Sequence, residues 1–144
     1  MPVPNVDISS AGSSITVSTG INDGYFVCLS TVDGDFIDST WVSGSTHTFT
    51  KPSDEFYFSI YKRDYIPYVV YCNSETHFLQ NVTIADNRFY DNSPFAVGED
   101  VDPSGTIGDV SLSSGAAVFI QKGSGGVLLD AGFKCNKGAQ LIIK

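Results

Sequence analysis

The sequence predicts an all-β protein, and three observations support that prediction. Residues that favour strands (Val, Ile, Thr, Tyr, Phe and Trp) outnumber the good helix formers by about two to one. The 14 glycines, and a large share of Asp among the 16 acidic residues, supply turn-forming residues along the chain. In the first half, short apolar runs recur about every 8–12 residues and are separated by turn signals.

The first predicted strands are separated by tight turns. Residues 15–18 alternate apolar and polar side chains, as a half-buried strand does. Residues 25–29 are apolar throughout, which predicts a strand buried on both faces. Between these strands Asn22-Asp23-Gly24 is a strong turn signal, and Asp33-Gly34 predicts a hairpin in which glycine takes a positive φ.

Further strands are expected over residues 36–42, 46–50, 56–61 and 65–72. The third of these alternates cleanly, so Phe56, Phe58 and Ile60 should lie on one face and Tyr57, Ser59 and Tyr61 on the other. Pro67 cannot donate to a strand ladder, so the last one should be an edge strand or contain a bulge. Short strands at this spacing predict an immunoglobulin-like antiparallel sandwich over residues 1–75.

The composition changes in the second half, residues 76–144. Aromatic residues become rare and glycines come close together. The segment 114–120 (SGAAVFI) is repeated 23 residues later as 137–143 (KGAQLII), and residues 126–133 repeat the same pattern of an apolar strand and a glycine corner. Such repeats predict a short, stacked, solenoid-like β-coil. A short coil needs a cap, which the first half could supply.

Two stretches resemble known families. Asp33-Gly34, residues 42–46 and the segment 56–68, which ends in Tyr65-Ile66-Pro67-Tyr68, resemble the immunoglobulin-like domain that follows the catalytic domain in gingipain-type cysteine peptidases. That resemblance covers residues 5–73. The second half is similar to the three-coathanger-stack repeats at the carboxy-terminal end of exported bacterial surface proteins. The matching residues are 97–101, 108–116, 127–133 and 137–139.

The resemblance implies a non-catalytic accessory, adhesive or spacer region at the C-terminal end of an exported bacterial surface protein, of which a cysteine peptidase is one example. It implies a secreted or cell-surface location, and an upstream domain of the same parent protein as a partner. Catalytic residues would belong to that upstream domain. This chain departs from the two patterns in carrying Cys28, Cys72 and Cys135.

Charge and hydropathy restrict the partners further. The net charge is −8 and the pI is about 4.4, a balance that repels nucleic-acid phosphates. No apolar run approaches the roughly 20 residues that a membrane-spanning helix needs. Residues 1–5 lack the basic start and apolar stretch of a signal peptide, so we expect any export signal to lie upstream.

The residues with reactive side chains do not form a catalytic or metal-binding motif. We therefore expect no enzyme activity, no cofactor and no metal, because the three cysteines and two histidines show neither zinc-ligand spacing nor a clear Cys–His pair. A Cys28–Cys72 disulfide stays open as an alternative to two thiols. The acidic turns at 33–35 and 99–102 can ligate calcium, but ordinary turn chemistry is the favoured interpretation.

The aromatic residues of the first half are the best binding candidates. If they share an exposed face, they can stack on the sugar rings of a glycan, as in a carbohydrate-binding module, or anchor a surface protein. The simpler interpretation, that they line the core or an inter-domain contact, is favoured. The candidates are Trp41, Tyr57, Tyr61, Tyr65 and Tyr68, with Tyr71 close by.

Overall fold

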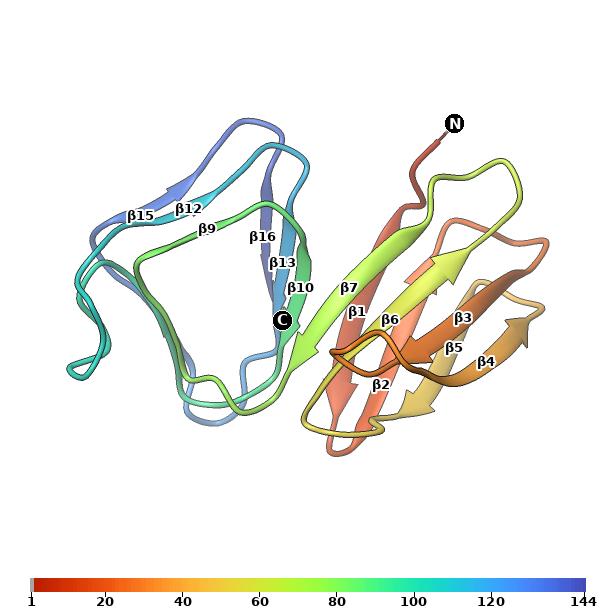
Figure 1. Cartoon of the computed structure of the whole chain (residues 1–144), viewed down its shortest axis with the longest axis horizontal. Coiled ribbons are helices and arrows are strands. Elements are labelled where there is room, and N and C mark those ends of the chain that lie inside the picture. The colour runs from red at the N-terminus through yellow and green to blue at the C-terminus, as the bar shows by residue number, and fades with distance from the viewer. Residues whose placement is uncertain (1) are drawn as a thin grey trace. The chain divides into compact units, whose positions relative to one another are not determined.

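The computed structural model describes residues 2–144 and contains two compact units (Figure 1). The first unit ends at Cys72 and the second is Asn73–Lys144, whereas the sequence placed the boundary after residue 75. The regular structure of the described residues consists of sixteen β-strands and no helix, which agrees with the predicted all-β class. None of the described residues therefore forms a helix that could cross a bilayer.

The first unit contains two antiparallel sheets. One has the order β1-β2-β5 and the other runs β7-β6-β3-β4, so β4 is an edge strand. The strands are β1 (Val6–Ala11), β2 (Ser14–Thr19), β3 (Tyr25–Ser30), β4 (Phe36–Val42), β5 (Thr46–Thr50), β6 (Glu55–Tyr61) and β7 (Tyr68–Asn73).

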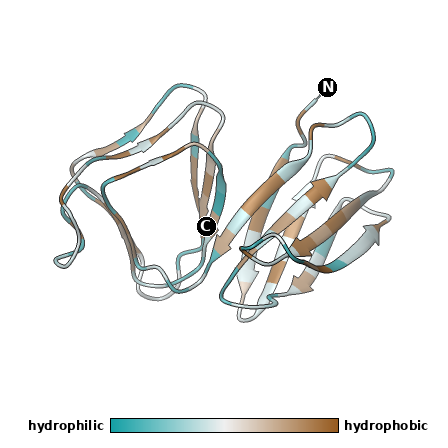
Figure 2. Ribbon diagram, in the orientation of Figure 1, coloured by the Kyte–Doolittle hydropathy of each residue, from teal (hydrophilic) through white to brown (hydrophobic). Residues whose placement is uncertain are grey.

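The core of the first unit lies on one face of each sheet. Phe56, Phe58 and Ile60 of β6 are fully buried, as their alternation predicted. Phe49 of β5 packs edge-on against Phe56 and Phe58, with ring centroids 6.1 and 5.6 Å apart. Figure 2 shows the result as apolar residues interleaved with polar ones along the strands. Burial of these side chains is the main stabilising contribution to this unit.

Two local predictions for the first unit were wrong, and one strand was missed. Strand β3 is not buried on both faces: Tyr25 and Val27 are buried, but Phe26 is exposed, because an antiparallel sheet leaves one face open to water. Pro67 lies before β7 and not inside it, since a proline would interrupt the ladder. Strand β1 was missed, although residues 6–9 alternate in the same manner as β2.

The second unit consists of three parallel three-stranded sheets that the chain visits in turn, three times over. The sheet orders are β14-β11-β8, β15-β12-β9 and β16-β13-β10. The strands are β8 (Phe78–Leu79), β9 (Val82–Ile84), β10 (Asn87–Tyr90), β11 (Phe95–Val97), β12 (Val110–Leu112), β13 (Ala117–Ile120), β14 (Val127–Leu129), β15 (Phe133–Cys135) and β16 (Gln140–Ile143). Each circuit of three strands is called a turn below.

The 23-residue repeat is one such turn. Strand β13 pairs in register with β16, so that Ile120 lies beside Ile143, and β12 pairs with β15 at the same offset. The glycine corners also coincide: the Gly115 N–H donates to the Gly138 carbonyl at 2.9 Å. Both glycines have positive φ, 89° and 87°, a conformation that other residues adopt with strain. The predicted repeat is thus confirmed at the level of backbone pairing.

A loop of residues 98–109 projects between β11 and β12 and is held by one side chain. Gln80 Oε1 accepts hydrogen bonds from the Val101 and Asp102 N–H groups at 2.6 and 2.8 Å. Its Nε2 donates to the Asp102 and Thr106 carbonyls at 3.2 and 3.0 Å. A single amide therefore satisfies four backbone groups that have no strand partner.

The stacked turns predict that Ile→Ala substitutions at two equivalent register positions lower the free energy of unfolding by different amounts. Ile120 is fully buried, whereas Ile143, at the same register one turn later, is 40% exposed. We expect Ile120→Ala to lower the free energy of unfolding by about 3–4 kcal/mol, because it leaves a cavity. Ile143→Ala should cost about 1 kcal/mol or less. Chemical denaturation of both variants measures the difference; equal losses would contradict this stacking.

Candidate functional site

Three exposed aromatic residues lie side by side on the outer face of the second sheet in the first unit. Phe26 of β3 is opposite Trp41 of β4 on one side and Tyr61 of β6 on the other. Their exposed fractions are 46%, 53% and 43%. We call Trp41, Phe26 and Tyr61 the aromatic row. Neighbouring large aromatic side chains left open to water often mark a binding surface.

The aromatic row is not a flat platform. The rings of Phe26 and Trp41 meet edge to face, with centroids 4.9 Å apart and planes inclined at 66°. Gly24 leaves space for the indole, since a Cβ on this residue would lie 2.2 Å from Trp41 Cζ2. The turn that contains Gly24 is tied to the end of β6 by an ion pair between Asp23 and Lys62 at 3.1 Å, and Lys62 keeps the pKa of the Asp23 carboxyl below its usual value.

The residues beside the aromatic row are small. Cys28 pairs in register with Ser39 and with Ser59, and its Sγ is 3.5 Å from Ser39 Oγ. The next register position brings back aromatic residues, with Ser30 opposite both Phe36 and Tyr57. The outer face therefore has small thiol and hydroxyl side chains between two sets of aromatic rings.

The predicted binding residues have different environments. Trp41 and Tyr61 are part of the aromatic row. Tyr57 is half-buried and packs against Tyr71, whose hydroxyl donates to Glu55 at 2.7 Å, and Tyr65 is half-buried in the turn after β6.

Tyr68 requires a correction, because only 7% of it is exposed and burial raises the pKa of its phenol to about 12. It is a core residue of β7 and not part of a binding surface. Phe26 is not among the binding residues predicted from the sequence. Residues 25–29 are all apolar, so no alternation indicates that the Phe26 side chain points outward.

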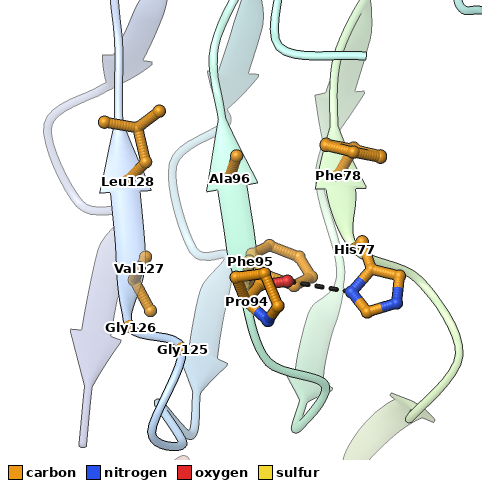
Figure 3. Close-up of a pocket in the computed structure, with 9 residues that line it drawn as sticks. All are labelled: His77, Phe78, Pro94, Phe95, Ala96, Gly125, Gly126, Val127 and Leu128. Carbon is orange, nitrogen blue, oxygen red and sulfur yellow. Dashed lines mark hydrogen bonds between the residues drawn. The ribbon is translucent and has the colours of Figure 1, made fainter.

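The second unit has a pocket of about 570 Å³ on the outer face of the sheet β14-β11-β8 (Figure 3). Ala96 lies between Phe78 and Leu128 in the register of the three strands, so a small residue separates two large apolar ones. Pro94, Gly125 and Gly126 line one end. The lining is mostly apolar, which suits a hydrophobic group and offers little to orient a polar one.

His77, the only titratable residue of this pocket, has both ring nitrogens engaged. Nδ1 is 2.9 Å from the Pro94 carbonyl, which can only accept, so Nδ1 carries the proton (Figure 3). Nε2 is 3.1 Å from Asn92 Nδ2, a donor, so Nε2 accepts. Through these two contacts the imidazole joins the segment before β8 to the segment before β11.

Cys28, Cys72 and Cys135 are all thiols, so the alternative of a Cys28–Cys72 disulfide does not hold in this structure. Within residues 2–144 no group of three metal-ligating side chains converges. In the acidic loop 99–102, the Asp102 carboxylate accepts from the Ser104 N–H and hydroxyl at 3.0 and 2.8 Å, which is the turn role favoured from the sequence.

Comparison with known proteins adds no relationship. No protein-family model matches the chain, and searches of curated proteins and of solved structures also found no match.

Trp41 is the single tryptophan, so its fluorescence tests the role of Gly24 directly. Gly24→Ala should displace the indole and shift its emission and its quenching by acrylamide, because the new methyl group overlaps the ring. Gly34→Ala is the matched control: its φ of 90° imposes similar strain, but nothing lies within 4 Å of its Cβ position. Identical spectra for the two variants would refute the proposed packing of the Trp41 indole against Gly24.

His47 of β5 should make stability depend on pH. Burial lowers the pKa of this imidazole below 6.5, so the folded chain favours the neutral ring. This contribution is present above pH 6.5 and is lost as pH falls through the folded pKa, because unfolding then takes up a proton. We expect the fall in Tm between pH 7.5 and pH 5.0 to be smaller for His47→Gln than for the unmutated chain. Equal falls would mean that the histidine does not contribute.

Proposed function

We propose that this chain is a non-catalytic adhesive module, an accessory region of an exported bacterial protein, and that the aromatic row is its contact surface. The observation that carries the proposal is the register of Trp41, Phe26 and Tyr61 across three strands, with each ring about half exposed. Tyrosine and tryptophan contribute strongly to binding because they bury a large area at a small cost in side-chain entropy.

The topology supports the structural part of this proposal. Strands β1, β2 and β5 form one sheet, and β3, β6 and β7 form the other with β4 added beside β3, a division typical of immunoglobulin-like sandwiches. The three stacked turns of the second unit favour a short, solenoid-like coil. Both architectures serve as spacers and binding scaffolds, which agrees with the resemblance to the ends of exported peptidases and surface proteins.

The chemistry of the reactive residues favours a module without catalysis. A nucleophilic cysteine needs a histidine with a nitrogen available to take its proton. Both nitrogens of His77 already have partners, and Cys72 is buried. The aromatic row itself contains neither an acid nor a base that works near neutral pH.

Carbohydrate binding is the second candidate, and the seating of Trp41 is the observation that favours it. An exposed indole held in one orientation can stack on the face of a sugar ring, and Ser39 lies beside it on β4 as a hydroxyl partner. The 66° angle between Trp41 and Phe26 disfavours a flat crystalline glycan. A soluble oligosaccharide, which can present one ring at a time, fits the geometry better.

One binding experiment distinguishes the two candidates. The full chain is applied to a glycan array and, in parallel, to immobilised matrix proteins such as collagen and fibronectin. For the primary proposal we expect binding to protein that Trp41→Ala weakens by about tenfold or more, as for an interface hot spot. Loss of glycan binding in the same variant would instead favour the carbohydrate candidate, and addition of that oligosaccharide should change the Trp41 fluorescence.

Ile107→Ala provides the control, because Ile107 is also an exposed apolar residue, in the second unit and outside the pocket. It should bind as the unmutated chain does. The aromatic row would be excluded as the contact surface if Trp41→Ala and Ile107→Ala had the same effect. Absence of binding in both arms would reject both candidates for the probes used.

A further inference from the structure

Strand β4 has one edge without a neighbouring strand among residues 2–144. It ends the order β7-β6-β3-β4 in the first unit, and all of its residues except Val42 are exposed (Figure 1). Since β4 is an internal strand of the chain, between β3 and β5, this edge is not produced by a chain end. Such an edge presents backbone N–H and C=O groups that can pair with a strand of another chain.

The backbone groups of Ser39, in the middle of β4, point to this edge. The Thr31 N–H donates to the Asp35 carbonyl across the β3–β4 hairpin at 2.9 Å, so the backbone groups of Thr31 face β4. Cys28, the β3 partner of Ser39, is three positions earlier and therefore faces the other way, toward β6. Ser39 in turn faces away from β3, and its N–H donates to the Asp38 carboxylate at 2.8 Å.

The sequence of β4 is complementary to itself when it is read in the opposite direction. In an antiparallel pair of two copies centred on Ser39, apolar residues meet apolar residues and each carboxylate meets a hydroxyl group. No two carboxylates are directly opposed, and the two Ser39 residues can exchange backbone hydrogen bonds because both face the edge. The pairs are Phe36 with Val42, Ile37 with Trp41, Asp38 with Thr40, and Ser39 with Ser39.

We propose that β4 pairs with β4 of a second copy of this chain, antiparallel and centred on Ser39, so that two copies form a symmetric dimer through one continuous sheet. The Ser39 N–H leaves the Asp38 carboxylate and donates to the Ser39 carbonyl of the second copy. The released carboxylate then accepts from the Thr40 hydroxyl of the second copy. Because the contact is symmetric, it uses the β4 edge of both copies and the assembly stops at two.

The dimer goes beyond the proposed adhesive function and does not depend on it. Directly opposed residues of an antiparallel pair lie on the same face of the sheet, so the outer faces of the two copies form one surface. The two aromatic rows then lie on that surface, where they can engage a repetitive ligand together. Ligand binding by a chain that stays monomeric would leave the adhesive function intact and overturn only the dimer.

Two features of the chain make this a weak dimer. Each copy has a net charge of −8, so two copies repel each other. Ile37 has no residue opposite it on β3, because Phe36 pairs with Ser30 and Asp38 with Leu29, and such a bulge twists an edge strand. Salt should strengthen the dimer, since it screens the repulsion.

The first test is sedimentation velocity of the full chain over a roughly hundredfold range of concentration, in about 0.05 M and about 0.5 M NaCl. We expect a monomer–dimer equilibrium that shifts toward the dimer in high salt, with no larger species. A chain that stays monomeric at every concentration in both salts would overturn the proposal. Growth beyond the dimer would overturn it as well, because a symmetric pair leaves no second β4 edge.

Cysteine cross-linking tests the register. Ser39→Cys is made in a Cys28→Ser, Cys135→Ser background, because Cys28 lies beside Ser39 and Cys135 is exposed. In the proposed pair the Cα atoms of the two residues 39 are about 5.5 Å apart, within disulfide range. Oxidised glutathione should therefore convert the dimer into a disulfide-linked one on a non-reducing gel.

Thr40→Cys in the same background is the matched register control. Residue 40 lies opposite residue 38, so the two Cα atoms of residue 40 are about 8 Å apart, beyond disulfide range. This variant should stay largely uncross-linked. Equal cross-linking of the two variants, or none with Ser39→Cys, would overturn the proposed register. Circular dichroism and thermal melts establish that both variants fold.

Asp38→Thr tests the competition for the Ser39 N–H. The substitution removes the carboxylate that holds this N–H and places two threonines opposite each other, so the dimer should become about threefold tighter or more. Asp54→Thr changes the net charge equally through an exposed residue outside β4 and should have a much smaller effect. Equal effects of the two substitutions would mean that only net charge matters and would overturn the proposed pairing.

Discussion

Backbone hydrogen bonding between strands is the constraint on which this protein depends. With no helix in the described residues, nearly every buried N–H and C=O group must find its partner on another strand. In the first unit each strand pairs with an antiparallel neighbour. In the second unit each strand pairs in parallel with the equivalent strand of the next turn. Wherever this pairing stops, a row of polar groups and a strip of apolar side chains remain at an edge.

The proposed contact surface arises from that constraint. The aromatic row lies on the open face of a sheet, where alternation directs every second side chain outward and where Trp41, Phe26 and Tyr61 occupy positions that polar residues usually take.

Glycine positions show how the chain combines these requirements. Gly115 and Gly138 let the chain turn the same corner in successive turns, at nearly equal φ. Gly24 has a different role, since its missing side chain leaves space for the indole of Trp41. A sequence pattern can identify the first kind through the repeat, but the second kind depends on a residue 17 positions away and is visible only in the folded chain.

The sequence by itself determined most strands of the first unit, the 23-residue repeat and the buried face of β6, because alternation and turn residues act over a few neighbouring positions. It did not determine which sheet each strand joins, that Phe26 faces outward, or that Tyr68 is buried while Trp41 and Tyr61 share one row. Those properties depend on the pairing register between strands that are distant in the sequence. They also depend on which face of each sheet is covered by the rest of the fold. Only the tertiary structure decides these properties, because the residues near a strand in the sequence do not specify which distant strand pairs with it.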